Sequence, residues 1–335
     1  MELNNTLVRT SRNFNINNIK IDVKIPEDIK EFKNIEIPED ATVLKEDLSL
    51  KYGIGLDYIE ANSKIKINLE NKEEQIIYNF DKENQNLTDQ ILINAKGKST
   101  ITIEYKALEE EKHFHNGVLK VIADENAEVN VNIINLLNET SDNFQAIESI
   151  LNKNAKVNYT IIDIGGKSSI TNYYSNLQGE NAQNNVKTVY LGVDEQLKDI
   201  NYIAELYGAK TNINIDVQGA LSDKAKKHFK GTIDFKKGCK KAKGDENEYC
   251  MLLSDKAKAI ALPMLLCAEE DVEGNHSTAS GKVDSKVLFY IMSRGLNYKE
   301  AVKLLVKSRF IKIIEQISEQ NLKNEIISKI DEKLN

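Results

Sequence analysis

The sequence predicts a mainly β protein built as a parallel β-helix, a type of solenoid, with a small mixed N-terminal region and an α-helical C-terminal domain. Three observations predict this fold. Strand-like segments follow one another from residue 86 to 268 without a long helical pattern, one corner motif recurs there at a nearly constant interval, and amphipathic helical patterns are confined to the end of the chain.

Residues 1–85 form the mixed N-terminal region. They contain Pro26 and Pro38, two of the three prolines of the chain, and short strand-like pieces such as IKIDVKI and KIKINLE. No steady period runs through them, so we expect a small irregular unit that precedes the β-helix.

Residues 86–268 are predicted to be the parallel β-helix core. Alanines at the starts of strands recur at intervals of 28, 27 and 27 residues, and each follows Asn or Gly: Ala127, Ala155, Ala182 and Ala209. This pattern is typical of stacked coils, with Asn or Gly in an unusual backbone conformation at each corner and a small residue packed inward. The strand lengths fit coils with three faces. An antiparallel sandwich, whose turns recur about every 8–12 residues, is the alternative fold.

Residues 269–335 are predicted to hold a site loop and a helical docking domain. Asp284 can cap a first helix, Gly295 stands where that helix should stop, and Asn297 with Glu300 resembles a capping box. The helices have two compatible interpretations. They cover the open end of the solenoid, or they offer a docking surface to a partner.

Composition and missing motifs exclude several classes of protein. The formal charge of 45 − 52 = −7 argues against a general nucleic-acid coat. The longest apolar run, residues 259–268, is too short for a membrane span, and the first residues lack the apolar stretch of a secretory signal. The three cysteines are too few for a disulfide scaffold, so a reducing cytoplasm is predicted. No phosphate-loop motif is present, which disfavours an autonomous ATPase.

Cys267 and His276 are the first candidates for chemistry. They lie nine residues apart in a stretch that also contains Glu273 and other acidic residues, and thiolate, imidazole and carboxylate together suit iron or zinc. The alternatives are a small buried cysteine, a hydrogen-bonded loop histidine and a solvated acidic turn.

The other cysteines and histidines carry weaker signals. Cys239 and Cys250 are eleven residues apart, outside the usual spacing of structural zinc sites, and Cys239 is more simply a corner residue. His113 and His115 would share one face of a strand, but two ligands without a third are better explained as exposed polar residues.

Three segments resemble the SufB/SufD family of iron–sulfur cluster assembly proteins, in the compact form seen in anaerobes and archaea. They are HFKGTIDF at 228–235, the stretch from GDENEYC to DVEGNH at 244–276, and SKVLFYIMSRGLNYKEAVKLLVKSRF at 285–310. The last segment matches the family pattern at the following residues: Leu288, Phe289, Tyr290, Ser293, Arg294, Gly295, Glu300, Ala301, Leu304, Leu305 and Phe310.

The resemblance implies a right-handed parallel β-helix and the role of a scaffold that is not itself an enzyme. Members pair through the β-helix, so the partner would be a second copy or a SufB/SufD paralogue. A SufC-type ABC ATPase would bind the C-terminal helices and alone supply ATP, a sulfur donor would feed the site, and an iron–sulfur cluster would be held transiently. His276 matches the family histidine at the subunit interface that is implicated in cluster assembly.

The chain departs from the B-type pattern in two ways. The strand before Pro263 has no cysteine, with Ala257 in that region, and Asn275 and Ser277 flank His276 where B-type members place a glutamate. The chain would therefore either use Cys267 in place of the missing thiolate or be D-like and depend on ligands from its partner.

The predicted ligands for a cluster or for sulfur are Cys267 and His276, with Glu273 as a weaker carboxylate candidate. The predicted docking residues for the ATPase are Leu288, Phe289, Arg294, Leu304, Leu305 and Phe310. A structural solenoid that docks and regulates the ATPase without binding a cluster is the alternative function. A carbohydrate-processing β-helix enzyme is disfavoured because we find no secretion signal.

Overall fold

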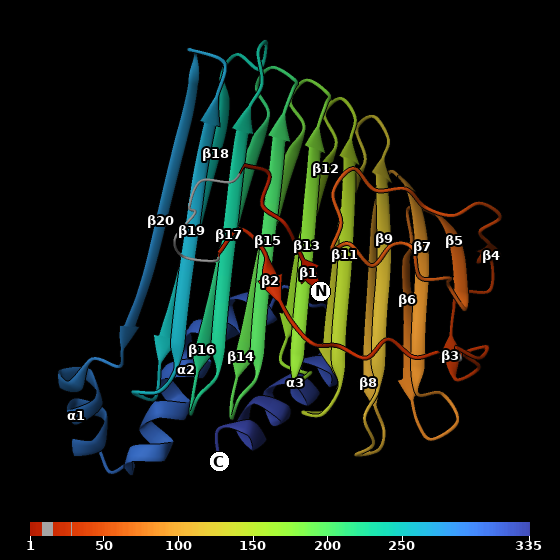
Figure 1. Cartoon of the computed structure of the whole chain (residues 1–335). Helices are drawn as coiled ribbons and strands as arrows, with labels where there is room; N and C mark the ends of the chain where they lie inside the picture. The colour runs from red at the N-terminus through yellow and green to blue at the C-terminus, as the bar shows by residue number, and fades with distance from the viewer. Residues whose placement is uncertain (9–15, 28) are drawn as a thin grey trace.

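The computed structural model describes residues 1–8, 16–27 and 29–335, and two long β-sheets dominate it (Figure 1). Each sheet has nine strands: eight are parallel, and the ninth is a short antiparallel strand at the N-terminal end. Sheet I consists of β4 (Thr42–Val43), β5 (Ser63–Glu70), β7 (Asn86–Lys96), β9 (Phe114–Ala123), β11 (Asp142–Leu151), β13 (Ser168–Leu177), β15 (Leu197–Leu206), β17 (Lys226–Phe235) and β19 (Lys258–Cys267). Sheet II consists of β3 (Ile35–Glu36), β6 (Glu73–Phe80), β8 (Lys98–Ala107), β10 (Glu128–Leu136), β12 (Lys156–Asp163), β14 (Gln183–Gly192), β16 (Asn212–Leu221), β18 (Ala242–Leu252) and β20 (Val272–Lys282).

Successive strands alternate between the two sheets, so that one strand of each makes one coil of a parallel β-solenoid with about eight turns. The predicted solenoid is thus confirmed, but each coil has two faces where strand lengths suggested three. The reason is the length of the strands. Most strands run for eight to eleven residues, so two strands and their corners fill one coil and leave no room for a third strand.

The corner chemistry follows the prediction at three coils. Asn126, Asn154 and Asn181 adopt left-handed backbone angles, with φ of 62°, 57° and 59°. Asn tolerates this region better than most residues, because its short side chain can hydrogen-bond locally. The alanine after each of them is buried in the core. The Asn154 amide donates to Asn126 Oδ1 over 2.9 Å, so the corners also bind each other along the solenoid axis.

The fourth predicted corner, Ala209, is displaced by two residues. The N–H of Asn212 bonds to Ala182 O, so Thr211, which is fully buried, occupies the position that Ala182 has one coil earlier. Ala209 is only half-buried. The coil is longer here, and Lys210 takes the left-handed conformation that Asn supplies elsewhere, with φ of 58°.

The parallel strands extend beyond the range 86–268 predicted for the β-helix core. β5 and β6 precede it, and β20 forms where a site loop was predicted. The run GNHSTASG has the composition of a loop, but it pairs with β18 in continuous parallel register from Val272 to Lys282. Pairing with a strand already in place therefore overrides weak β-propensity. The division into domains at residues 85 and 268 stays a prediction.

The N-terminal segment lies across the outer face of sheet I (Figure 1). Its two short strands, β1 (Glu2–Leu3) and β2 (Ile19–Lys20), pair antiparallel. Asn4 is fully buried and donates to Asp199 Oδ1 over 2.6 Å, while Lys230 donates to Asn4 O. Residues 9–15 and 28 of the predicted mixed region lie outside the described residues.

The described residues form three helices, α1 (Ser285–Ser293), α2 (Tyr298–Ile314) and α3 (Gln320–Lys333). Both predicted N-caps are confirmed: the Asp284 side chain accepts from Lys286 N–H, and Asn297 with Glu300 forms a capping box. None of these helices combines the length and the apolar character that a membrane span needs.

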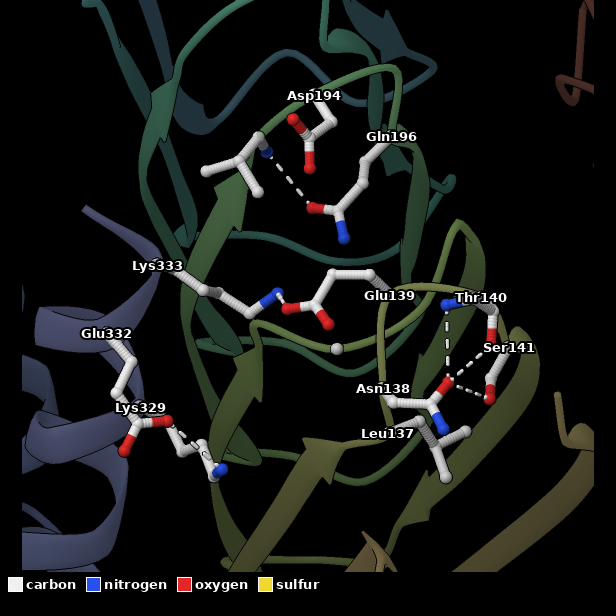
Figure 2. Close-up of polar contacts among 12 residues, drawn as sticks. Leu137, Asn138, Glu139, Thr140, Ser141, Asp194, Gln196, Lys329, Glu332 and Lys333 are labelled. Atoms are coloured by element: carbon white, nitrogen blue, oxygen red, sulfur yellow. Dashed lines mark hydrogen bonds and ion pairs between the residues drawn. The ribbon is translucent and has the colours of Figure 1, made fainter. Parts of the chain in front are cut away.

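The helices do not cover the open end of the solenoid, contrary to one prediction. α2 and α3 pack against the outer face of sheet II, where apolar side chains such as Ile134, Ile162 and Val189 would otherwise meet water. The C-terminal end of α3 reaches the corner after β10. There Lys333 pairs with Glu139 at 2.6 Å, beside a turn in which Asn138 accepts from Ser141 Oγ (Figure 2).

Candidate functional site at the open end of the solenoid

The last coil leaves one end of the solenoid open. β19 and β20 are the terminal strands of their sheets, and in the described part of the chain each pairs along one edge only. No residue of β20 is buried. The N-terminal end differs, because the two-residue antiparallel strands β3 and β4 cover part of its edges and Phe32 packs onto Tyr78 and Phe80.

His276 faces the interior of the solenoid at this open end. A Cβ added to Gly274 would lie 2.9 Å from the Phe235 ring and 3.5 Å from Leu265, so the even-numbered residues of β20 point inward. His276 is therefore inward-facing, and it lies in register with Glu246 of β18.

Cys267 ends β19 and is exposed, with its thiol 2.9 Å from Glu269 O. It lies in register with Phe235, whereas Pro263, four residues earlier, lies in register with Gly231. Gly231 faces the carboxylate of Glu246, so Pro263 belongs to the layer of His276. At about 3.3 Å per residue, Cys267 and His276 lie roughly 13 Å apart along the strand direction. One chain alone does not bring them together.

Glu273 points away from His276. Its carboxylate pairs with Lys243 of β18 at 2.8 Å on the outer face of sheet II. Accordingly, the described residues contain no group of three or more His, Cys, Asp or Glu side chains that could hold a metal ion. Of the two residues on β20, Glu273 thus faces outward and His276 inward, because successive side chains of a strand alternate between faces. Cys267 shares the register position of the inward-facing Phe235, so distance along the strands, and not orientation, separates it from His276.

The other candidate residues are buried in the solenoid. All three cysteines are free, and burial raises the pKa of Cys239 and of Cys250 to about 11, so both thiols stay protonated at neutral pH. His113 and His115 are fully buried, which corrects their interpretation as exposed polar residues. The His115 ring lies 2.8 Å from Asp89 and 2.6 Å from Asn143, so both of its nitrogens have buried partners and the residue is part of the core.

Sequence reasoning missed Glu246. It is 1% exposed, and neither carboxylate oxygen has a hydrogen-bond partner among the residues that the structure describes. Burial, together with the neighbouring charge of Glu248, raises the pKa of Glu246 to about 8. Glu248 faces inward as well, but it has a countercharge, since its Oε1 lies 2.7 Å from Lys227 Nζ and accepts from Tyr190 Oη, while its Oε2 has no hydrogen-bond partner among the described residues. The strand sequence GDENEYC reads as polar, and only the register shows which of its acids are buried.

The predicted docking residues divide into exposed and buried ones. α1 has no buried residue, and Phe289 is 74% exposed. Leu304 of α2 is also exposed, whereas Leu288 and Leu305 are half-buried. Phe310 is buried against sheet II, so the expectation that it faces a partner is wrong. Arg294 is exposed, and its guanidinium donates to Tyr290 Oη over 3.1 Å.

Fold and site together define a parallel β-solenoid with two uncovered surfaces, its open end and the apolar side of α1. The family model described as "SUF system FeS cluster assembly, SufBD core domain" matches residues 78–309. The chain belongs to this family, which confirms the resemblance found in the sequence.

Named relatives agree with this assignment. The iron–sulfur cluster assembly protein SufD of Bacillus subtilis is 25% identical over 264 residues, which cover 78% of this chain and 60% of that protein. SufD of Escherichia coli is 22% identical over 72% of this chain and 57% of its own length. A SufBD family protein of Pyrococcus horikoshii is 30% identical over 58% of this chain and 43% of its own. The chain thus matches about 60% or less of the length of these relatives.

Proposed function

We propose that the chain is a scaffold subunit for iron–sulfur cluster assembly, and that its open end is where iron and sulfide meet. The observation that carries this proposal is the inward-facing imidazole of His276 on an uncovered terminal coil, in a member of the SufBD core family. A neutral imidazole binds iron well, and the position leaves coordination sites free for other ligands.

A second chain completes the site. Cys267 and His276 are too far apart to bind one ion, and β19 and β20 each leave one edge unpaired. Such edges are templates for pairing with another chain. The partner is a second copy or a SufB/SufD paralogue. Because two of the relatives are SufD proteins, we favour a D-like role, in which the partner supplies the thiolate that the strand before Pro263 lacks.

The second uncovered surface binds a SufC-type ABC ATPase. α1 presents Phe289, Tyr290 and Met292 to solvent, and these side chains are 74%, 59% and 39% exposed. An amphipathic helix with apolar anchors three and four residues apart suits a hydrophobic groove. ATP acts only through this partner. The scaffold itself catalyses no reaction, and it works in a reducing cytoplasm, where a sulfur donor supplies sulfide and its free thiols persist.

Anaerobic reconstitution with ferrous iron and sulfide tests the proposal. We expect cluster absorption when the chain is combined with its ATPase and its pairing partner, and loss of that absorption in His276→Ala. If the folded complex develops no cluster absorption, the chain is instead a structural solenoid that docks and regulates the ATPase without binding a cluster.

A further inference from the structure

Glu246 lies in β18, one coil beneath the open end of the solenoid. A carboxylate that is buried without a hydrogen bond or a cation destabilises a fold, unless it is protonated or binds a ligand. Glu246 has neither kind of partner in the described structure, although its side chain is 1% exposed. The Glu246 carboxyl group is therefore either protonated or bound to a ligand.

The surroundings make room for this carboxylate but do not neutralise it. Across the core, a Cβ on Gly231 would lie 2.0 Å from Glu246 Oε2, so the missing side chain of Gly231 leaves the space that the carboxylate fills. On one side Glu246 lies in register with Ile215 of β16, and on the other with His276 of β20.

The lysines nearby are committed to other acids. Lys227 faces inward, but its ammonium lies 2.7 Å from Glu248. Lys230 binds Asp199 at 2.7 Å, on the face covered by the N-terminal segment. Within the described part of the chain, the inward-facing pair Glu246 and Glu248 therefore has one ammonium between them, which leaves one carboxylate without a countercharge.

We propose that Glu246 is a ligand for ferrous iron, acting together with His276 from the neighbouring strand. The two residues are register partners on adjacent strands, and both face inward at the open end. This inference rests on the proposed function and adds a residue to its site. The ion would take the place of the missing countercharge.

The donor set suits ferrous iron as the cargo. One imidazole nitrogen and up to two carboxylate oxygens are ligands that iron accepts, and they leave positions for sulfide or for groups from the second chain. A carboxylate fixed in the core would hold the ion at the terminal coil before sulfide arrives. Binding displaces the carboxyl proton of Glu246 to solvent, and it involves no change in oxidation state.

Ferrous binding by the full-length chain tests the inference without sulfide or ATPase. Under anaerobic conditions, competition with a chromophoric chelator gives the dissociation constant, and thermal unfolding with and without iron gives a second readout. We expect Glu246→Gln to weaken ferrous binding roughly tenfold or more and to abolish the iron-induced rise in Tm. Glu246→Asp, which keeps the charge but shortens the side chain, should bind iron with intermediate affinity.

The matched control is Glu273→Gln, the same change on the outer face of the same end, and it should leave ferrous affinity unchanged. Metal-free Glu246→Gln should unfold at the same temperature as the wild type or higher, since it removes a buried unpaired acid. Wild-type affinity in folded Glu246→Gln, or no ferrous binding by the wild type, overturns the inference. If His276→Ala loses iron while Glu246→Gln keeps it, only the role of Glu246 fails and the proposed function stands.

Discussion

Glu205 shows how a single residue ties the N-terminal segment to the solenoid. Burial alone would raise its pKa, but hydrogen bonds from Lys51, Tyr174 and Lys236 outweigh burial and lower the pKa from 4.5 to about 2. Lys51 belongs to the N-terminal segment, whereas Glu205 lies in β15 of sheet I. The carboxylate thus holds together parts of the chain that are distant in sequence.

Glu205→Gln should therefore destabilise the protein in a pH-dependent way. The lowered pKa stabilises the folded state fully above pH 4.5, and this stabilisation is lost as the pH falls through about 2. At neutral pH the loss should be on the order of 3 kcal/mol, measured by urea unfolding, and it should shrink as the pH falls toward 2. Glu180→Gln, which removes an exposed pair with Lys210, should change little. An equal effect of Glu205→Gln at pH 7 and pH 2.5 would contradict this account.

The two cysteines Cys267 and Cys239 should respond oppositely to the same change. Cys267 is exposed, so Cys267→Ser should leave the free energy of unfolding unchanged and abolish cluster formation if its thiolate is a ligand. Cys239 is buried, so Cys239→Ser should cost about 1–3 kcal/mol of stability and leave the cluster yield intact. Iron and sulfide content per chain, with chemical unfolding, checks both. Unchanged cluster yield in folded Cys267→Ser would remove this residue from the site.

Among the elements, α1 carries the clearest docking signal. Leu288 and Ile291 are half-buried, whereas Phe289, Tyr290 and Met292 stay exposed, Phe289 the most at 74%. Phe289→Asp should leave the fold intact and weaken binding of the ATPase by roughly tenfold or more, as expected for an aromatic anchor. Titration of the purified ATPase, followed by calorimetry, measures the effect. Leu108→Asp, at another exposed apolar residue, is the control. Equal affinities for both variants would rule out α1 as the docking element.

Some structural elements could be predicted from the sequence and others could not. The corners were predictable because only a few residues accept left-handed angles, and Asn126 and Asn154 show this in the sequence. The strand β20 was not predictable, because its conformation comes from pairing with β18 and not from its own residues. The burial of Glu246 could not be predicted for a related reason. Whether an acid faces the core or water depends on register, which a polar strand does not reveal.

At the scale of the whole molecule, the predicted docking surface of α2 was also partly wrong, because Phe310 is buried against sheet II. The helix has apolar residues on more than one side, and the sequence could not show which side sheet II would cover. Phe310 is buried because the outer face of β12 and β14 is itself apolar, through Ile162 and Val189. His276 and Cys267 were found by residue type, but their separation along the strand direction follows from the register of β19 and β20, which the sequence does not show.

The two ends of the solenoid differ in a way that predicts how it associates. Short antiparallel strands, β3 and β4, cover part of the edges at the N-terminal end, whereas β19 and β20 leave theirs open along their whole length in the described structure. Unpaired edges with apolar side chains favour pairing with another chain, and Ile260 of β19 is 40% exposed there. Ile260→Glu should therefore weaken association with a second copy or a paralogue by roughly tenfold, about 1.4 kcal/mol.

Sedimentation velocity of the chain, alone and mixed with its paralogue, over a range of concentrations measures this effect. The matched control is Val43→Glu in β4, at the N-terminal end of the same sheet, where the side chain is 76% exposed. Because β4 pairs antiparallel at an end that we expect no partner to approach, this variant should associate like the wild type. If the two substitutions weaken association equally, or if only Val43→Glu does, the open end is not the pairing surface. The cluster site would then have to be complete within one chain, which the separation of Cys267 from His276 opposes.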